Sequence, residues 1–325
     1  MPLYFFRQLT LLACAIAGLT ATPLATAQTW PTKPVRIVLQ FPPGGSTDVV
    51  ARILAQTMTS ALGQPVVVEN KPGADGAIAA EFVLRSEPDG HTYFLASNTP
   101  MMQVPLLKKN PPYDPIKSFT PVSLVGRYIY VLVSSPSVPA NTAAELIDYG
   151  RKNPGKLNYG SYSGVTQLMH TKLKDDAKMD LNLIPYKGEG PTINDILGGH
   201  VQFTFATPTS TQAHIKEGKL KALAILLPKR SPLMPEIPTA AEAGVPPLGA
   251  DTWAALFGPA NMSPAITTRM SEALNAAIAN PEAREKISRQ GFDLGGSTPA
   301  ELADFMQVQL KGWAKAFADS GMKPE

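Results

Sequence analysis

The stretch VRIVLQFPPGGSTDVVAR, residues 35–52, decides the fold that we predict for this chain. It begins with a short, nearly continuous apolar run, which is typical of a β-strand covered on both faces. The glycine-rich turn at residues 42–45 ends the strand, and apolar residues at helical spacing follow it. We expect Ser46, Thr47 or Asp48 to cap this helix, because their side-chain oxygens accept free backbone N–H groups. The stretch therefore predicts a strand, an open turn and a helix start.

This succession is typical of an anion-binding site. The N–H groups at the start of a helix point outward, and the helix dipole favours negative charge there. The pattern recurs at residues 157–166, where a short strand runs into a Gly- and Ser-rich turn and a second helix start. A polar loop at residues 97–99 also follows a predicted strand. Successive β-α-β units indicate parallel sheets, whose ligands lie beyond the carboxyl ends of the strands.

The length of 325 residues suits one large or two medium domains. We predict two α/β lobes, the second inserted into the first. Residues 28–131 and 252–325 form lobe 1, and residues 132–251 form lobe 2. Two segments then cross between the lobes, and such lobes form a cleft that hinges shut on a ligand.

Residues 1–27 are predicted to be a secretory signal peptide, cleaved after Ala27. The apolar segment at residues 9–19 is too short for a membrane span. Cys14, the only cysteine, lies within it. A lipoprotein anchor at Cys14 is disfavoured, because apolar sequence follows it. Cleavage leaves a mature chain without disulfides or a thiol nucleophile.

Several function classes are excluded by composition and motifs. The net charge of +3 and the scattered basic residues do not indicate a nucleic-acid surface. The four histidines lack metal-ligand spacing, so we predict no metal and no cofactor. Residues 160–164 fail the G-x-S-x-G pattern of hydrolases, because Tyr162 stands where serine is required. No Gly-Lys-Ser/Thr motif follows the first turn, which excludes a phosphate-binding loop. We therefore predict that the chain is not an enzyme.

Three side chains allow two interpretations. His170 is interpreted as a partly buried histidine with local hydrogen bonds in preference to a ligand contact. Asp48 is interpreted as a helix cap, since a carboxylate facing an anion site would repel the ligand. Lys187 is either a surface residue or a positive charge at the cleft rim, and the sequence favours neither.

The chain resembles the periplasmic solute-binding proteins of the tripartite tricarboxylate transporter type, called Bug or TctC-like receptors. The resemblance covers essentially the whole mature chain. The motifs that carry it are PTKPVR (31–36), FPPGGSTDVVAR (41–52), NKPGADG (70–76), PDG (88–90), NPGKLNY (153–159), PYKG (185–188), HIK (214–216), IPT (237–239), AEAG (241–244) and GGSTP (295–299).

The resemblance implies a two-lobed α/β fold of the type II-like periplasmic binding-protein kind. Each lobe is expected to be a mainly parallel sheet flanked by helices, with the ligand in the interlobe cleft. It also implies a periplasmic, monomeric receptor that captures a small carboxylate and delivers it to a membrane transporter by transient contact. Main-chain N–H groups and hydroxyls would hold the carboxylate. The site residues expected from the resemblance and from the strand ends are Phe41, Pro43, Gly44, Gly45, Ser46, Thr47, Asp48, Ser97, Asn98, Ser161, Tyr162, Ser163, Gly164, Thr166, Ala206 and Thr207.

Two departures from the family pattern narrow the expected ligand. Many relatives carry an Asp where this chain has Ala206-Thr207-Pro208, and such an Asp could hold a ligand ammonium group. Tyr162 stands where many relatives have a Ser- or Gly-rich turn, and its ring could stack on a flat ligand or fill space. We therefore expect a dicarboxylate or an aromatic carboxylate in preference to an amino acid. The alternative function is a periplasmic sensor that binds the same ligand and docks on a signalling receptor.

Overall fold

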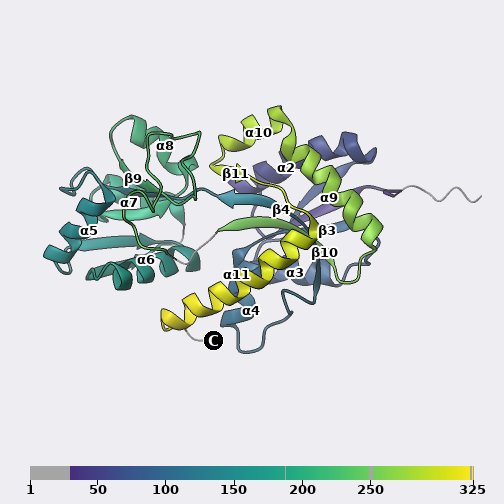
Figure 1. The fold of residues 1–325 in the computed structure, drawn as a ribbon, viewed down its shortest axis with the longest axis horizontal. Coiled ribbons are helices and arrows are strands. Elements are labelled where there is room, and N and C mark those ends of the chain that lie inside the picture. Colours follow the sequence, from purple (N-terminus) through teal and green to yellow (C-terminus); the bar gives the residue numbers. More distant parts are fainter. Residues whose placement is uncertain (1–29, 187, 249–251, 323, 325) are drawn as a thin grey trace, which may run out of the picture.

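The computed structural model describes residues 30–186, 188–248, 252–322 and 324. The predicted signal peptide and Lys187 lie outside the described residues. Two lobes lie side by side along the longest axis of the molecule (Figure 1). Each contains one β-sheet with helices packed around it, so the prediction of two α/β lobes is confirmed.

The sheet of lobe 1 is six-stranded, in the order β11-β4-β10-β3-β1-β2. β1 pairs in parallel with β2 and β3, whereas β10 is antiparallel to β3 and β4, and β11 is antiparallel to β4. The strands are β1 (Val35–Leu39), β2 (Val66–Asn70), β3 (Thr92–Ser97), β4 (Phe119–Tyr128), β10 (Trp253–Pro259) and β11 (Phe292–Leu294). The helices are α2 (Ser46–Leu62), η1 (Ala74–Gly76), α3 (Ala77–Leu84), η2 (Thr99–Gln103), α4 (Val104–Leu107), α9 (Pro264–Ala279), α10 (Pro281–Ser288) and α11 (Pro299–Asp319).

The sheet of lobe 2 is five-stranded, in the order β7-β6-β8-β5-β9. β6 is parallel to β7 and β8, and β5 is antiparallel to β8 and β9. The strands are β5 (Val131–Ser134), β6 (Leu157–Ser161), β7 (Leu181–Pro185), β8 (Phe203–Ala206) and β9 (Lys221–Ile225). The helices are α5 (Ala143–Lys152), α6 (Gly164–Asp176), α7 (Glu189–Leu197) and α8 (Pro208–Lys216).

Strand β1, which lies between β3 and the edge strand β2, is covered on both faces, as its continuous apolar run predicts. Ile37 and Leu39 pack in the same apolar cluster as Leu54 of α2. Val38 points to the opposite face and packs in the cluster that contains Phe94. All five of these side chains are buried. The α2 helix is therefore pressed onto one face of the sheet, and its first turn is held at the carboxyl end of β1.

The chain passes from lobe 1 to lobe 2 between Tyr128, the last residue of β4, and Val131, the first residue of β5. The boundary expected after residue 131 therefore falls within β5. The chain is back in the sheet of lobe 1 at Trp253. The strands next to these crossings, β4, β5 and β10, supply the antiparallel pairings of the two sheets.

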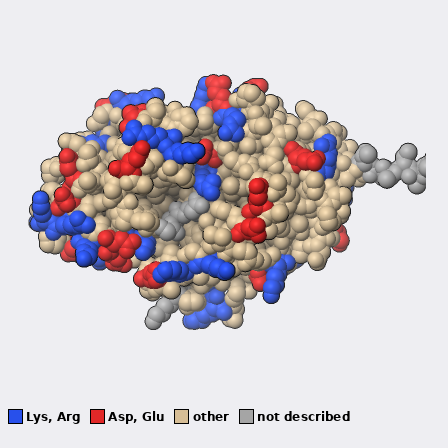
Figure 2. Space-filling model, viewed as in Figure 1, with Lys and Arg blue, Asp and Glu red and all other residues tan. Residues whose placement is uncertain are grey.

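The surface gives no sign of a single-sign charged face in the view shown. Figure 2 shows basic and acidic side chains interspersed over both lobes. Within the described part of the chain, no helix combines the length and apolar character needed to cross a bilayer.

Candidate functional site

A cleft of about 510 Å³ lies between the lobes, beside the crossing segments. Residues of both lobes and of the crossings form its wall. Lobe 1 contributes Phe41, Ser46, Thr47, Ser97, Asn98 and Thr99, the crossings contribute Tyr128, Tyr130 and Thr252, and lobe 2 contributes Tyr162, Ser163, Val165, Glu189, Gly190, Thr207, Thr209 and Ser210. Most of these side chains are neutral and carry hydroxyl or amide groups.

The structure brings the two predicted loops together across this cleft. The expected site residues that line it are Phe41, Ser46, Thr47, Ser97, Asn98, Tyr162, Ser163 and Thr207. The expected site residues that do not line it are Pro43, Gly44, Gly45, Asp48, Ser161, Gly164, Thr166 and Ala206.

The start of α2 differs from the predicted cap. The N-cap residue is Gly45, and no side chain caps the helix. Ser46 and Thr47 follow Gly45 in the first turn of the helix, and their hydroxyls form hydrogen bonds outside the helix. Ser46 Oγ donates to the carbonyl oxygen of Gln290 at 2.8 Å, and Thr47 Oγ1 lies 2.7 Å from the Tyr128 hydroxyl. The first N–H groups of α2, which no helix can pair internally, are therefore left without a side-chain cap at the cleft.

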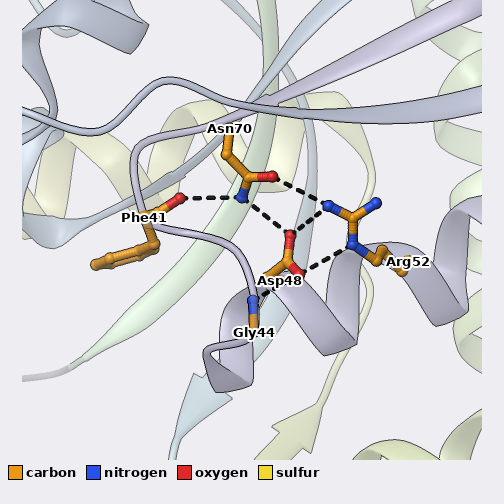
Figure 3. A network of polar contacts seen from close by, with 5 residues as sticks. All are labelled: Phe41, Gly44, Asp48, Arg52 and Asn70. Atoms are coloured by element: carbon orange, nitrogen blue, oxygen red, sulfur yellow. Dashed lines mark hydrogen bonds and ion pairs between the residues drawn. The ribbon is translucent and has the colours of Figure 1, made fainter.

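Asp48 holds the first loop in shape (Figure 3). Its carboxylate accepts hydrogen bonds from the Gly44 N–H at 3.0 Å, from Arg52 Nε and Nη2 at 2.9 Å each, and from Asn70 Nδ2 at 2.9 Å. Asn70 Nδ2 also donates to the Phe41 carbonyl oxygen at 3.0 Å. Gly44 has a φ of +88°, a conformation that side chains rarely tolerate. Asp48 thus fixes the conformation of a turn that needs glycine, and it does not line the cleft.

The charge of Asp48 is neutralised within the loop. The hydrogen bond from Arg52 is the largest influence that lowers its pKa, to about 2, against the opposing effect of burial. Asp48 is 3% exposed, whereas the Arg52 side chain is half exposed. The carboxylate therefore does not act as an unpaired negative charge beside the anion site.

On the lobe 2 side, the predicted helix start is formed by a capping box. Ser163 Oγ accepts the Thr166 N–H at 3.2 Å, and Thr166 Oγ1 accepts the N–H groups of Ser163 and Tyr162 at 3.0 Å. Thr166 is fully buried and shapes the turn, while Ser163 lines the cleft. A Cβ at Gly164 would lie 2.6 Å from the side chain of Gln103 in lobe 1, so glycine permits this close approach of the lobes.

Three tyrosines form much of the cleft wall. Tyr128 and Tyr130 come from the first crossing, and Tyr162 comes from lobe 2. Burial raises the pKa of Tyr128 to about 12, and burial, followed by the charge of Glu189, raises the pKa of Tyr130. The Tyr162 hydroxyl donates to the Phe205 carbonyl oxygen at 3.1 Å. These rings are neutral at physiological pH and present both flat apolar surface and hydroxyl groups.

Sequence reasoning did not find Tyr128, Tyr130 or Glu189. The sequence predicts a strand over residues 128–134 that begins with these two tyrosines, and only the position of the crossing places them in the cleft. Glu189 is the first residue of α7. Its carboxylate accepts hydrogen bonds from the Thr207 N–H, from Thr207 Oγ1 at 3.2 Å and from Ser210 Oγ at 2.6 Å. Residues 206–208 lack an Asp, but Glu189 supplies a carboxylate at this point. The missing Asp is therefore no argument against a ligand ammonium group.

His170 does not line the cleft. It is buried, its ring centroid lies 4.8 Å from that of Tyr159, and burial lowers its pKa to about 4. It is therefore a neutral core residue. Among the described residues, no cluster of His, Cys, Asp and Glu side chains has the arrangement of a metal site.

The two lobes also meet beside the cleft. Thr209 Oγ1 of lobe 2 donates to the Gln290 carbonyl oxygen of lobe 1 at 2.8 Å, the same oxygen that accepts from Ser46. A Cβ at Gly291 would lie 2.8 Å from the Pro208 ring. The loop after α10 therefore contacts the starts of both α2 and α8.

Two α/β lobes joined by crossing segments, with a polar cleft at the crossings, define a solute-binding receptor. The chain belongs to the TctC family, described as the tripartite tricarboxylate transporter family receptor, whose model matches residues 50–322. Members of this family are periplasmic substrate-binding proteins and not enzymes.

Relatives and solved structures agree with this assignment. Protein BugT of Bordetella pertussis is 35% identical over 312 residues, which cover 95% of each chain. The structure of the periplasmic binding protein BugD is 33% identical with a TM-score of 0.76, covering 91% of this chain and 100% of that one. An R. palustris protein solved with adipate is 29% identical with a TM-score of 0.78, covering 91% of this chain and 100% of that one.

The substitution Asp48→Asn should reduce the free energy of unfolding at pH 7 by about 1 kcal/mol, since solvent around half-exposed Arg52 screens the pair. The pKa of Asp48 is about 2 in the folded chain and higher in the unfolded chain. Its contribution is therefore present above about pH 4 and lost as the pH falls toward 2. Urea unfolding of both proteins at several pH values measures this difference.

Glu282→Gln is the control, because Glu282 pairs with Lys286 on an exposed helix face. It should change stability little. A stability difference between Asp48→Asn and the unmodified protein that stays constant from pH 7 to pH 2 would contradict the assigned role.

Thr47→Val should weaken the binding of a carboxylate probe such as adipate or benzoate by about tenfold, because a hydroxyl at the start of α2 is replaced by a methyl group. Isothermal titration calorimetry measures the Kd. Thr57→Val is the matched control on the same helix, since Thr57 Oγ1 donates to the Ile53 carbonyl oxygen and Thr57 does not line the cleft. An equal Kd for the two variants would exclude Thr47 from the binding surface.

Proposed function

We propose that the chain is a periplasmic receptor that captures a small organic carboxylate and delivers it to a tripartite tricarboxylate-type membrane transporter. It acts as a monomer and reaches the periplasm through the signal peptide at residues 1–27. The transporter subunits contact it transiently, when a ligand is bound. Membership of the TctC family supports both the carrier role and the class of transporter.

The observation that carries the carboxylate assignment is the convergence of helix starts on one cleft. The first turn of α2 supplies Ser46 and Thr47, and the start of α6 supplies Ser163 and Val165. N–H groups in a first turn point away from the helix and favour an anion. No Lys or Arg is among the described residues that line the cleft. N–H groups and hydroxyls would then hold the carboxylate from both lobes.

The ligand is a dicarboxylate or an aromatic carboxylate in preference to an amino acid. The cleft volume of about 510 Å³ is ample for either. Tyr128, Tyr130 and Tyr162 offer flat surfaces on which an aromatic ring can stack. One solved relative was obtained with adipate, which is a dicarboxylate. These observations support a small carboxylate with a largely apolar body.

A thermal-shift screen tests the proposal. The panel contains benzoate, 4-hydroxybenzoate, adipate, malate, citrate, aspartate and glutamate. A ligand at about a hundred times its Kd should raise the melting temperature by about 5 °C, because it binds the folded state alone. At least one carboxylate without an amino group should give a rise that grows with concentration.

Two results would contradict the proposal. If no carboxylate raises the melting temperature up to millimolar concentration, the chain is not a carboxylate receptor. If only aspartate and glutamate stabilise it, the ligand class is an amino acid. Mass spectrometry of the ligand after incubation should recover it unchanged, in agreement with a receptor that performs no chemistry.

A further inference from the structure

Glu189 places a negative charge in the wall of the cleft. It is the only residue with a charged side chain among the described residues that line the cleft. Among the described residues, its hydrogen-bond donors are the Thr207 N–H, the Thr207 hydroxyl and the Ser210 hydroxyl, all of which are neutral. Neutral donors stabilise a carboxylate without cancelling its charge. The field of Glu189 therefore acts on whatever lies in the cleft.

The same carboxylate already occupies the start of α8. Thr207 is the N-cap of α8, and Ser210 lies in its first turn. An anion bound at this helix start would compete with Glu189 for the same N–H and hydroxyl groups. The starts of α2 and α6 have no acidic side chain of this kind in the cleft wall. The carboxylate of a ligand is thus directed toward α2 and α6 and away from α8.

Glu189 can also accept one more hydrogen bond. An ionised carboxylate has about four acceptor positions, two on each oxygen. Oε1 accepts from the Thr207 N–H and from Ser210, and Oε2 accepts from the Thr207 hydroxyl. One acceptor position on Oε2 is therefore open to a donor on the ligand.

We propose that Glu189 determines the ligand class: the cleft selects a monocarboxylate whose far end donates a hydrogen bond and carries no negative charge, and it rejects a second carboxylate there. This inference rests on the proposed function and, of the two ligand classes named there, excludes the dicarboxylate. With three tyrosines in the wall, an aromatic hydroxycarboxylate meets all of these conditions. A second ligand carboxylate next to Glu189 would face a like charge in a partly buried site, where repulsion exceeds its value in water.

The test compares ligands that differ only at the far end. Calorimetry at pH 7.5 gives Kd values for 4-hydroxybenzoate and terephthalate, and for the aliphatic pair 6-hydroxyhexanoate and adipate. The unmodified protein should bind at least one hydroxycarboxylate about tenfold more tightly than the matched dicarboxylate, or better. This ratio needs no variant and is a test in itself.

The variant Glu189→Gln keeps the size of the side chain and its acceptor oxygen but removes the charge. It should reduce the preference for the hydroxycarboxylate by about tenfold, mainly through tighter binding of the dicarboxylate. Glu145→Gln is the matched control. Glu145 is also in the first turn of a lobe 2 helix and accepts a backbone N–H, from Asn141, but it does not line the cleft. The control should leave the ratio unchanged, and circular dichroism checks the folding of both variants.

The outcomes separate this inference from the proposed function. The role of Glu189 is overturned if the unmodified protein binds the dicarboxylate more tightly than the hydroxycarboxylate. It is also overturned if Glu189→Gln has the same ratio of the two Kd values as the unmodified protein. Either result leaves the proposed carboxylate receptor intact. The role of Glu189 is likewise overturned if neither hydroxycarboxylate binds while other carboxylates do. If no carboxylate binds, the proposed function and this inference both fall.

Discussion

The first loop depends on one buried carboxylate. Asp48 joins the Gly44 N–H, the guanidinium of Arg52 and the amide of Asn70, and Asn70 in turn holds the Phe41 carbonyl (Figure 3). The network ties both ends of the turn to α2 and to the end of β2. Because α2 is pressed onto β1, the turn has a rigid support on two sides. The N–H groups at the start of α2 are therefore held in place before any ligand arrives, which reduces the entropy that binding must overcome.

Asp48 and Glu189 both lie in the first turn of a helix that begins beside the cleft, and their different partners give them different effects on a ligand. Asp48 is bonded to Arg52, so its charge is compensated inside the loop and its pKa is lowered to about 2. Within the described part of the chain, Glu189 is bonded only to neutral donors on Thr207 and Ser210, so its charge remains effective in the cleft. A carboxylate close to an anion site is thus compatible with anion binding when an Arg shares its oxygens. A carboxylate without such a partner, like Glu189, repels ligands that carry a second negative charge near it.

Much of the architecture could be predicted from local sequence because it depends on local physics. The apolar run of β1, the glycine turn and the capping motif at Ser163 each fix a conformation within a few residues. The cleft wall depends on contacts between distant segments, and there the sequence was less informative. Tyr128 and Tyr130 look like ordinary strand residues until the crossing point is known. Glu189 meets Thr207 across 18 positions, which no periodicity encodes. The assignment of Asp48 as a cap was right in one respect, because its carboxylate accepts a backbone N–H beside the helix start, that of Gly44. The sequence did not show that Asp48 also bonds Arg52 and Asn70 and so holds the loop together.

The contacts between the lobes link ligand discrimination to the arrangement of the lobes. The Gln290 carbonyl accepts hydrogen bonds from Ser46 at the start of α2 and from Thr209 at the start of α8. Thr209 follows Thr207, whose N–H and hydroxyl bind Glu189, so the charged wall of the cleft and the lobe contact belong to the same helix start.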